Sequence, residues 1–167
     1  MHLRWLICVL LGVAAAPAAA APASATANAQ VKVTVTKPLV LTFVQDLSLG
    51  TVLIQDGAWA NATVGISRVG AFTCSPNITC SGAAQVATYR VAGTNNQAVN
   101  ITAPDVVLVN QSDATKTLTM TVDSPQTVLL PNSGNPGVDF SIGGSIALSP
   151  STVDGTYSGT FNVTVDY

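Results

Sequence analysis

The chain has 167 residues, of which 48% are hydrophobic and only 8% are charged, and its formal net charge is -2. An ordinary soluble domain carries about 25% charged residues, so the surface of this protein depends on neutral polar side chains instead. No basic run with interleaved aromatic residues occurs, which argues against nucleic acid as a partner. The composition favours an exported β-protein or fibre subunit over a cytoplasmic enzyme.

Residues 1–20 have the composition of a secretory signal peptide. A short basic start that ends at Arg4 precedes an apolar run and then a series of small residues. Cleavage is predicted after Ala20 or at a later site, up to Ala29. The stretch is too rich in Ala and Pro to predict stable membrane insertion, so we expect export with removal of this segment.

Residues 21–36 are predicted to form an extended N-terminal arm. Small or apolar side chains occupy alternate positions and end with Val31, Val33 and Val35, which share one face of an extended chain. Two interpretations fit this pattern. The arm is either a strand donated to a neighbouring subunit, or residues 31–35 are the domain's own first strand and the Ala-rich piece before them is discarded with the signal or stays disordered.

Residues 37–167 are predicted to form one all-β domain. Apolar residues recur with a period of two, Val and Thr dominate, and turn residues separate the short segments. The pair Gly143-Gly144 lies inside a strand-like run and predicts a bulge or a close backbone crossing. The predicted strands cover residues 31–43 (interrupted at 37–38), 51–54, 63–69, 86–91, 98–102, 106–109, 117–122, 138–148 and 157–167. This spacing is typical of a sandwich or a barrel.

Cys74 and Cys80 are the two cysteines that remain after removal of the predicted signal peptide. An even pair in an exported chain, with Pro76 and Asn77 between its members, predicts a disulfide that closes a turn. The rival interpretations are a redox thiol and a metal site. Two sulfurs without a His or a second Cys pair cannot complete a zinc site.

Catalysis and metal binding find little support in the sequence. The predicted mature chain has no His and no Glu, and neither a nucleophile motif nor a Gly-rich phosphate loop occurs. Side-chain oxygens in or beside loops, such as those of Asn110 and Asp113, lack the regular spacing of calcium ligands. Asn and Asp are common at such positions because their side chains stabilise turns. A single Trp without neighbouring aromatic residues favours a role for Trp59 in filling the core or in contacting another subunit over a role in stacking against a sugar. We expect no enzymatic activity, no cofactor and no metal site.

Both ends of the predicted domain carry a resemblance to a known family. Residues 138–148 (VDFSIGGSIAL) and 154–167 (DGTYSGTFNVTVDY) resemble the ending of exported bacterial pilin-like proteins, which are related to spore coat protein U and to subunits of archaic or alternative chaperone-usher pili. Residues 38–41 and 46–50 are similar to the opening of the same family, with Leu49 in place of Phe. The middle of the chain is less diagnostic, and its cysteine pair is not a feature expected of the family.

The resemblance implies an immunoglobulin-like antiparallel β-sandwich that lacks one strand and leaves a groove for the arm of a neighbour. The implied partners are other copies or sibling subunits, with a periplasmic chaperone and an outer-membrane usher during assembly. In this scheme the donor-strand candidates are Val31, Val33 and Val35. The groove edge that a chaperone would first contact consists of Phe161, Val163, Val165 and Tyr167. The other interpretation of this edge is an ordinary core strand.

The expected function is therefore that of a non-catalytic structural subunit of a bacterial surface fibre or coat. It would assemble by donor-strand exchange after transit through the periplasm, and it would support adhesion or biofilm formation at the cell surface. The alternative is a self-complete, monomeric secreted sandwich that binds surface carbohydrate or polymer. The two functions differ in the fate of the arm over residues 21–36.

Overall fold

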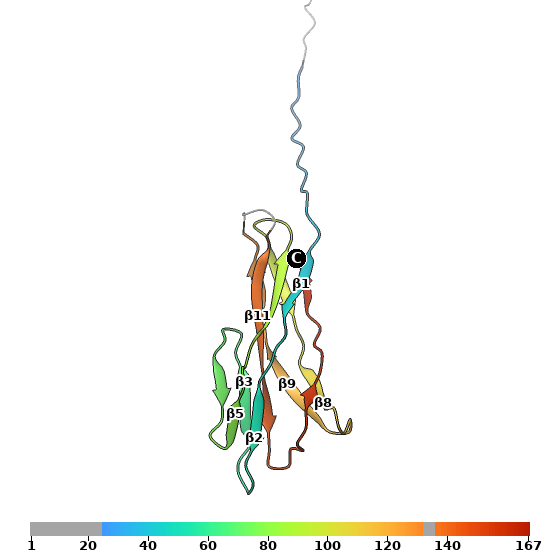
Figure 1. Ribbon diagram of the computed structural model, residues 1–167. Coiled ribbons are helices and arrows are strands. Elements are labelled where there is room, and N and C mark those ends of the chain that lie inside the picture. Colours follow the sequence, from blue (N-terminus) through green and yellow to red (C-terminus); the bar gives the residue numbers. More distant parts are fainter. Residues whose placement is uncertain (1–24, 132–135) are drawn as a thin grey trace, which may run out of the picture. The chain divides into compact units, whose positions relative to one another are not determined.

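The computed structural model describes residues 25–131 and 136–167, and this part of the chain contains strands and loops but no helix (Figure 1). The predicted signal peptide falls on residues 1–20 and lies outside the described residues. The chain divides after Thr34, and the unit Val35–Tyr167 contains every described strand.

The strands of this β-domain are short and are joined by turns. They are β1 (Val40–Gln45), β2 (Thr51–Ile54), β3 (Ala62–Ile66), β4 (Phe72–Cys74), β5 (Ile78–Ser81), β6 (Ala87–Ala92), β7 (Ala98–Thr102), β8 (Val106–Asn110), β9 (Thr117–Asp123), β10 (Thr127–Leu129), β11 (Val138–Leu148), β12 (Tyr157–Ser158) and β13 (Thr164–Asp166).

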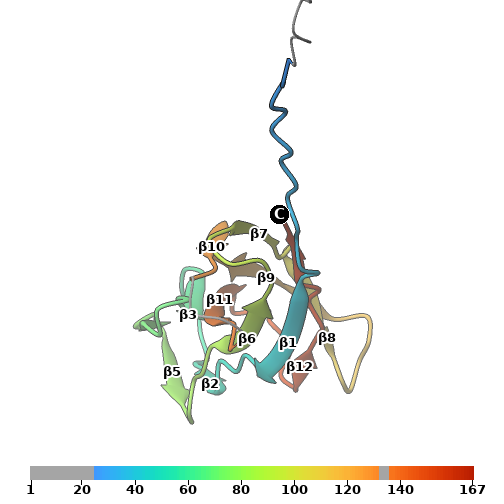
Figure 2. The same ribbon diagram turned by 90° about the horizontal axis from the view of Figure 1, so that it is seen from above.

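Antiparallel ladders join the strands into three sheets. The largest follows the order β1-β6-β11-β9-β8-β12, with β3 attached to β11 and β4 attached to β3. The smaller sheets have the orders β10-β7-β13 and β2-β5. Seen from above, the strands surround the interior of the β-domain (Figure 2). Apolar side chains from all three sheets bury each other there in two adjoining clusters, so the predicted antiparallel β-sandwich is confirmed.

Strand β11 connects the two core clusters. Its first half pairs with β6, and after Gly143 it pairs with β3 on one side and β9 on the other. Phe140 belongs to one cluster and Ile146 to the other. A side chain at Gly143 would collide with the backbone of residues 66–68 at the end of β3. The close backbone crossing predicted at Gly143-Gly144 is therefore confirmed.

The C-terminal segment corrects one prediction, because residues 157–167 do not form a single strand. Its first part, β12, pairs with β8, its last part, β13, pairs with β7, and residues 159–163 belong to no ladder. The connection between β7 and β8 contains Pro104, which has no backbone N–H to donate. The β8–β12 ladder and the β7–β13 ladder separate at this connection. Residues 159–163, which run opposite it, pass from the sheet of β8 to the sheet of β7.

Two further differences concern short or irregular segments. Of the predicted strand over residues 31–43, only the part from Val40 onward is a strand in the structure. Residues 25–39 form no strand. Strands β4, β5 and β10 were not predicted, since each has only three or four residues and too few alternating positions to produce a pattern.

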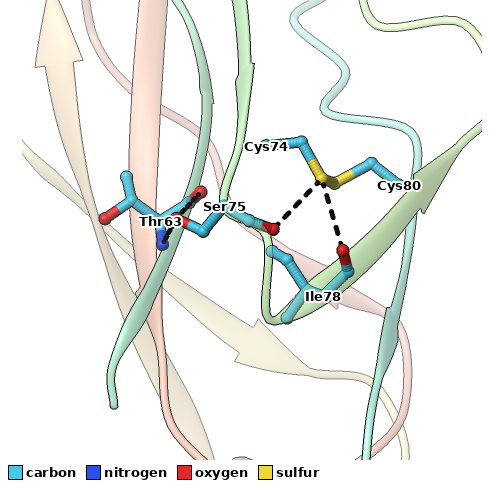
Figure 3. Close-up of a disulfide and its surroundings, with 5 residues drawn as sticks. All are labelled: Thr63, Cys74, Ser75, Ile78 and Cys80. Carbon is cyan, nitrogen blue, oxygen red and sulfur yellow. Dashed lines mark hydrogen bonds between the residues drawn. A yellow bond between two sulfur atoms is a disulfide. The ribbon is translucent and has the colours of Figure 1, made fainter. Parts of the chain in front are cut away.

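Cys74 and Cys80 form the predicted disulfide (Figure 3). It joins β4 to β5, which belong to different sheets, so it fastens the β2–β5 ribbon to the main sheet. The hydroxyl of Ser75, next to Cys74, accepts a hydrogen bond from the Thr63 N–H at 2.8 Å and donates to the Thr63 carbonyl at 3.1 Å. The loop is thus attached to β3 on one side and to β5 on the other.

Replacing both cysteines by Ser (C74S/C80S) should lower the free energy of unfolding by about 2 kcal/mol, because the unfolded chain loses the constraint of a short closed loop. Urea unfolding of the variant and of the oxidised wild type would measure this difference. Wild type unfolded in the presence of a reductant should match the variant. Equal stability of the oxidised and reduced wild type would contradict this role of the disulfide.

An ion pair on the outer face of β6 and β11 should make stability depend on pH. Arg90 Nε lies 2.6 Å from Asp139 Oδ1, and Arg90 Nη2 lies 2.8 Å from Oδ2. These hydrogen bonds, with a smaller contribution from the charge of Arg90, hold the pKa of Asp139 below its ordinary value of 3.8. A lowered pKa means that the stabilisation is present above the unfolded-state pKa and is lost as the pH falls through the lower folded-state pKa.

The substitution Asp139→Asn should therefore lower the melting temperature slightly at neutral pH, and the difference from wild type should disappear in acid. The effect is small because the two side chains are 51% and 47% exposed, and solvent screens such a pair. Melting curves across the acidic range would check it, with Arg90→Gln as the matched variant. A difference that persists unchanged in acid would contradict the ion-pair explanation.

Candidate functional site

Two edges of the β-domain lie side by side without a ladder between them. β1 pairs with β6 on one side only, and the C-terminal segment pairs only with β8 and β7. Figures 1 and 2 both show the C-terminal segment, in red, next to β1. No ladder joins these two edges within the described part of the chain. We call residues 40–45 and 159–165 together the seam.

The core is incompletely covered at the seam. Phe43 of β1 is opposite Tyr89 of β6, with ring centroids 5.9 Å apart, and Tyr89 stacks on the buried Phe140 at 5.8 Å. Residues directly opposite each other share one face of a sheet, so Phe43 faces the core. Nevertheless it is 54% exposed. Tyr89 is partly buried, and this burial, together with the charge of Asp46, raises the pKa of its phenol.

The opposite edge of the seam brings together three of the four residues predicted for the groove edge. Phe161, Val163 and Val165 are half-buried and pack against the core cluster that contains Phe140. The ring of Phe161 lies 6.4 Å from that of Tyr89. Only Val165 lies within a ladder. The structure thus places these side chains on one core-facing edge, while their contact with a chaperone stays a prediction.

Tyr167, the fourth predicted edge residue, makes a hydrogen-bonded cluster that the sequence did not predict. Its hydroxyl accepts from the Thr94 N–H at 2.7 Å and donates to the Lys37 carbonyl at 2.7 Å. The Lys37 N–H donates to Thr94 Oγ1, also at 2.7 Å. We call Lys37, Thr94 and Tyr167 the clasp. Lys37 and Tyr167 are 130 positions apart, so no local pattern could reveal their contact.

The candidate donor residues are fully accessible. Residues 25–38 are exposed throughout, and the exposed fractions of Val31, Val33 and Val35 are 93%, 79% and 79%. Consecutive exposed valines at alternate positions are unusual, because soluble proteins tend not to gather large apolar side chains in water without a use for them. Their role as a donated strand stays a prediction.

The β-domain also contains a polar recess of about 500 Å³. It offers hydroxyl groups, one charged side chain, Lys116, and one aromatic ring, that of Tyr157, whose hydroxyl already donates to the Val153 carbonyl at 2.8 Å. The lining residues are Asn61, Thr115, Lys116, Thr117, Leu118, Ala147, Leu148, Ser149, Ser151, Thr152, Val153 and Tyr157. This recess is a candidate site for the alternative function, carbohydrate binding.

Asn110, the last residue of β8, was considered above for a calcium site and has a structural role. Its side chain is 1% exposed, its Oδ1 accepts from the Ser112 N–H at 2.8 Å, and its Nδ2 donates to the Asp154 carbonyl at 2.9 Å. Over residues 25–131 and 136–167 no group of three or more His, Cys, Asp or Glu side chains is placed to hold a metal ion. The same residues include no helix of a length and apolarity that would cross a membrane.

Trp59 is half-buried at the margin of the core. It packs against the core cluster around Ile146, and its Nε1–H donates to the Gln55 carbonyl at 2.9 Å. Its indole is therefore committed to the fold rather than presented as a platform for a sugar.

Comparison with known proteins gives one match. A family model described as a domain of unknown function (DUF4402) matches residues 39–167. No curated protein matches the chain, and no solved structure matches it. The matched region begins one residue before β1 and contains every strand described above, whereas the arm precedes it.

Proposed function

We propose that this chain, which belongs to the family described as a domain of unknown function (DUF4402), is a non-catalytic structural subunit of a bacterial surface fibre or coat. The subunit would be exported with its signal peptide removed and would assemble by donor-strand exchange. The assembled fibre would support adhesion or biofilm formation. The observation that carries this proposal is the seam.

The seam has the chemistry of a site for an added strand. Phe43 on β1 faces the core yet is half-exposed, and among residues 25–131 and 136–167 neither edge of the seam has a partner on the side that faces the other edge. Natural sheets protect such edges with charges, Pro or bulges that twist them away. β1 reads Val-Leu-Thr-Phe-Val-Gln and contains neither a charge nor Pro, and of these devices it carries only a shift of register against β6 between Phe43 and Gln45. An inserted strand would pair with both edges and cover the exposed core, which is the mode of recognition called β-strand addition.

The arm of a second copy is the proposed occupant. Val31, Val33 and Val35 would face the core side chains of the seam, and the polar residues between them would face solvent. Residues 25–36 in extended form span about 40 Å, against about 20 Å for the six residues of β1, so the arm has ample length.

Assembly partners follow from the same scheme. The seam would be occupied first by a strand of a periplasmic chaperone and then, at an outer-membrane usher, by the arm of another copy or a sibling subunit. The resemblance of residues 138–148 and 154–167 to exported pilin-like proteins supports this order of events. The final location would be the cell surface or an extracellular fibre.

Electrophoresis of the native exported protein in SDS, with and without boiling, tests the proposal. Strand-exchanged sandwiches unfold slowly, so unboiled protein should give a ladder that collapses to a monomer band on heating. A single monomer band in the unboiled lane, from protein shown by circular dichroism to be folded, would overturn it. The polar recess then favours the second candidate function, a monomeric module that binds carbohydrate or polymer.

A further inference from the structure

The clasp ties together the two edges of the seam at one end. Lys37 precedes β1, and Tyr167 follows β13, so the hydrogen bond from the Tyr167 hydroxyl to the Lys37 carbonyl bridges one edge to the other. The fit is close, because a Cβ at Gly93 would lie 2.6 Å from the Tyr167 hydroxyl oxygen. A side chain at this position would require the phenol of Tyr167 and the side chain of Leu39 to shift.

Both backbone groups of Lys37 are occupied in the clasp. The N–H donates to Thr94 Oγ1, and the carbonyl accepts from the Tyr167 hydroxyl at 2.7 Å and from Thr94 Oγ1 at 3.4 Å. The bond from Tyr167 is much the shorter of the two, so the Tyr167 hydroxyl is the principal donor to this carbonyl oxygen.

This occupancy opposes one particular movement of the chain. For the arm to enter the seam of its own domain beside β1, the backbone must reverse direction between residues 36 and 40. The ordinary solution is a four-residue turn with Pro38 in its second position, closed by a bond from the Val40 N–H to the Lys37 carbonyl. The Val40 N–H would then have to share that oxygen with the Tyr167 hydroxyl, so the turn competes with the clasp for the same acceptor.

We propose that the clasp, through the Tyr167 hydroxyl, keeps this chain's own arm out of its own seam and so reserves the seam for the arm of a second copy. Tyr167 is then a positioning residue that decides between self-insertion and exchange. The inference rests on the proposed function in that it takes the seam to accept an arm of this sequence.

Trypsin cleavage after Lys32, in the middle of the arm, reports whether the arm is inserted. In purified monomer of the wild type this bond should be cut rapidly. In Tyr167→Phe, which keeps the ring but removes the hydroxyl, self-insertion should protect the bond and lengthen its half-life about fivefold to tenfold. Tyr157→Phe is the matched control, because it also removes a hydroxyl bonded to a carbonyl, that of Val153, and should behave as wild type.

Equal half-lives in the three proteins would overturn the inference, and so would a wild-type monomer whose Lys32 bond is already protected. If Tyr167→Phe fails to fold, Thr94→Val removes the other side chain of the clasp and carries the same expectation. The electrophoretic ladder separates this inference from the proposed function. If the wild type forms a ladder but the half-lives of the Lys32 bond are equal, the role of the clasp is contradicted and the fibre proposal stands. If Tyr167→Phe protects the Lys32 bond but the wild type forms no ladder, the role of the clasp stands and the fibre proposal is contradicted.

Discussion

The double substitution Val33→Asp/Val35→Asp should abolish the SDS-resistant ladder without lowering the melting temperature of the β-domain. Both valines are 79% exposed in the chain by itself, so replacing them removes no packing from the fold. In an exchanged strand, however, each new carboxylate would be buried against apolar core side chains without a partner, which costs several kcal/mol per group. Unboiled electrophoresis and a thermal melt of the same preparation measure the two effects.

Thr34→Asp/Thr36→Asp is the matched control for this prediction. It adds the same charge to the same segment but on the face that would point to solvent, so the ladder should persist. A ladder that survives Val33→Asp/Val35→Asp would contradict insertion of the valine face. Loss of the ladder in both variants would mean that charge on the arm matters and that its alternation does not.

The substitution Gly143→Val should destabilise the domain by at least about 3 kcal/mol and prevent its accumulation as folded protein. Its Cβ would lie 2.5 Å from the Ser67 carbonyl carbon and 2.6 Å from the Arg68 nitrogen, and it would collide with the Ile66 carbonyl oxygen. All three obstacles are backbone atoms, which cannot rotate away as a side chain can. The Arg68 N–H also donates to Asp123 Oδ2 at 2.8 Å, so displacing this backbone would disturb that hydrogen bond.

Ala147→Val in the same strand is the control for the Gly143 prediction. Ala147 is exposed on β11, and Val is at least as favourable as Ala in a strand, so stability should change little. Urea unfolding of both variants measures the comparison. A Gly143→Val protein as stable as wild type would show that the crossing of β11 over the end of β3 relaxes freely.

The sequence predicted those parts of the fold that depend on local alternation. β7 and β11 have the predicted bounds, because each carries a clear period of two between turn residues, and β2 has the predicted bounds as a short apolar run before a turn. The division of residues 157–167 could not be predicted in the same way. Phe161, Val163 and Val165 continue the alternation through the break, and the cause of the break, Pro104, lies in the segment that runs opposite.

The candidate site was predictable to a similar extent. Counting cysteines was enough for the disulfide, and alternation was enough to select the valines of the arm. The uncovered position of Phe43 was not predictable, because its exposure depends on which edges meet across the sandwich rather than on its neighbours in sequence. The clasp was not predictable either, since a Tyr hydroxyl and a distant backbone carbonyl leave no shared pattern.

The partner change along β11 has a consequence for the time course of folding. This strand supplies residues to both core clusters and pairs with β3, β6 and β9, of which β3 lies far earlier in the chain. Contacts between such distant segments raise the contact order, and loop closure must precede any gain from them, so folding is slow. The buried members of one cluster extend to Ile142 and those of the other to Leu148, so neither cluster is complete before β11 has been synthesised, and until then the apolar strands before it remain exposed to aggregation.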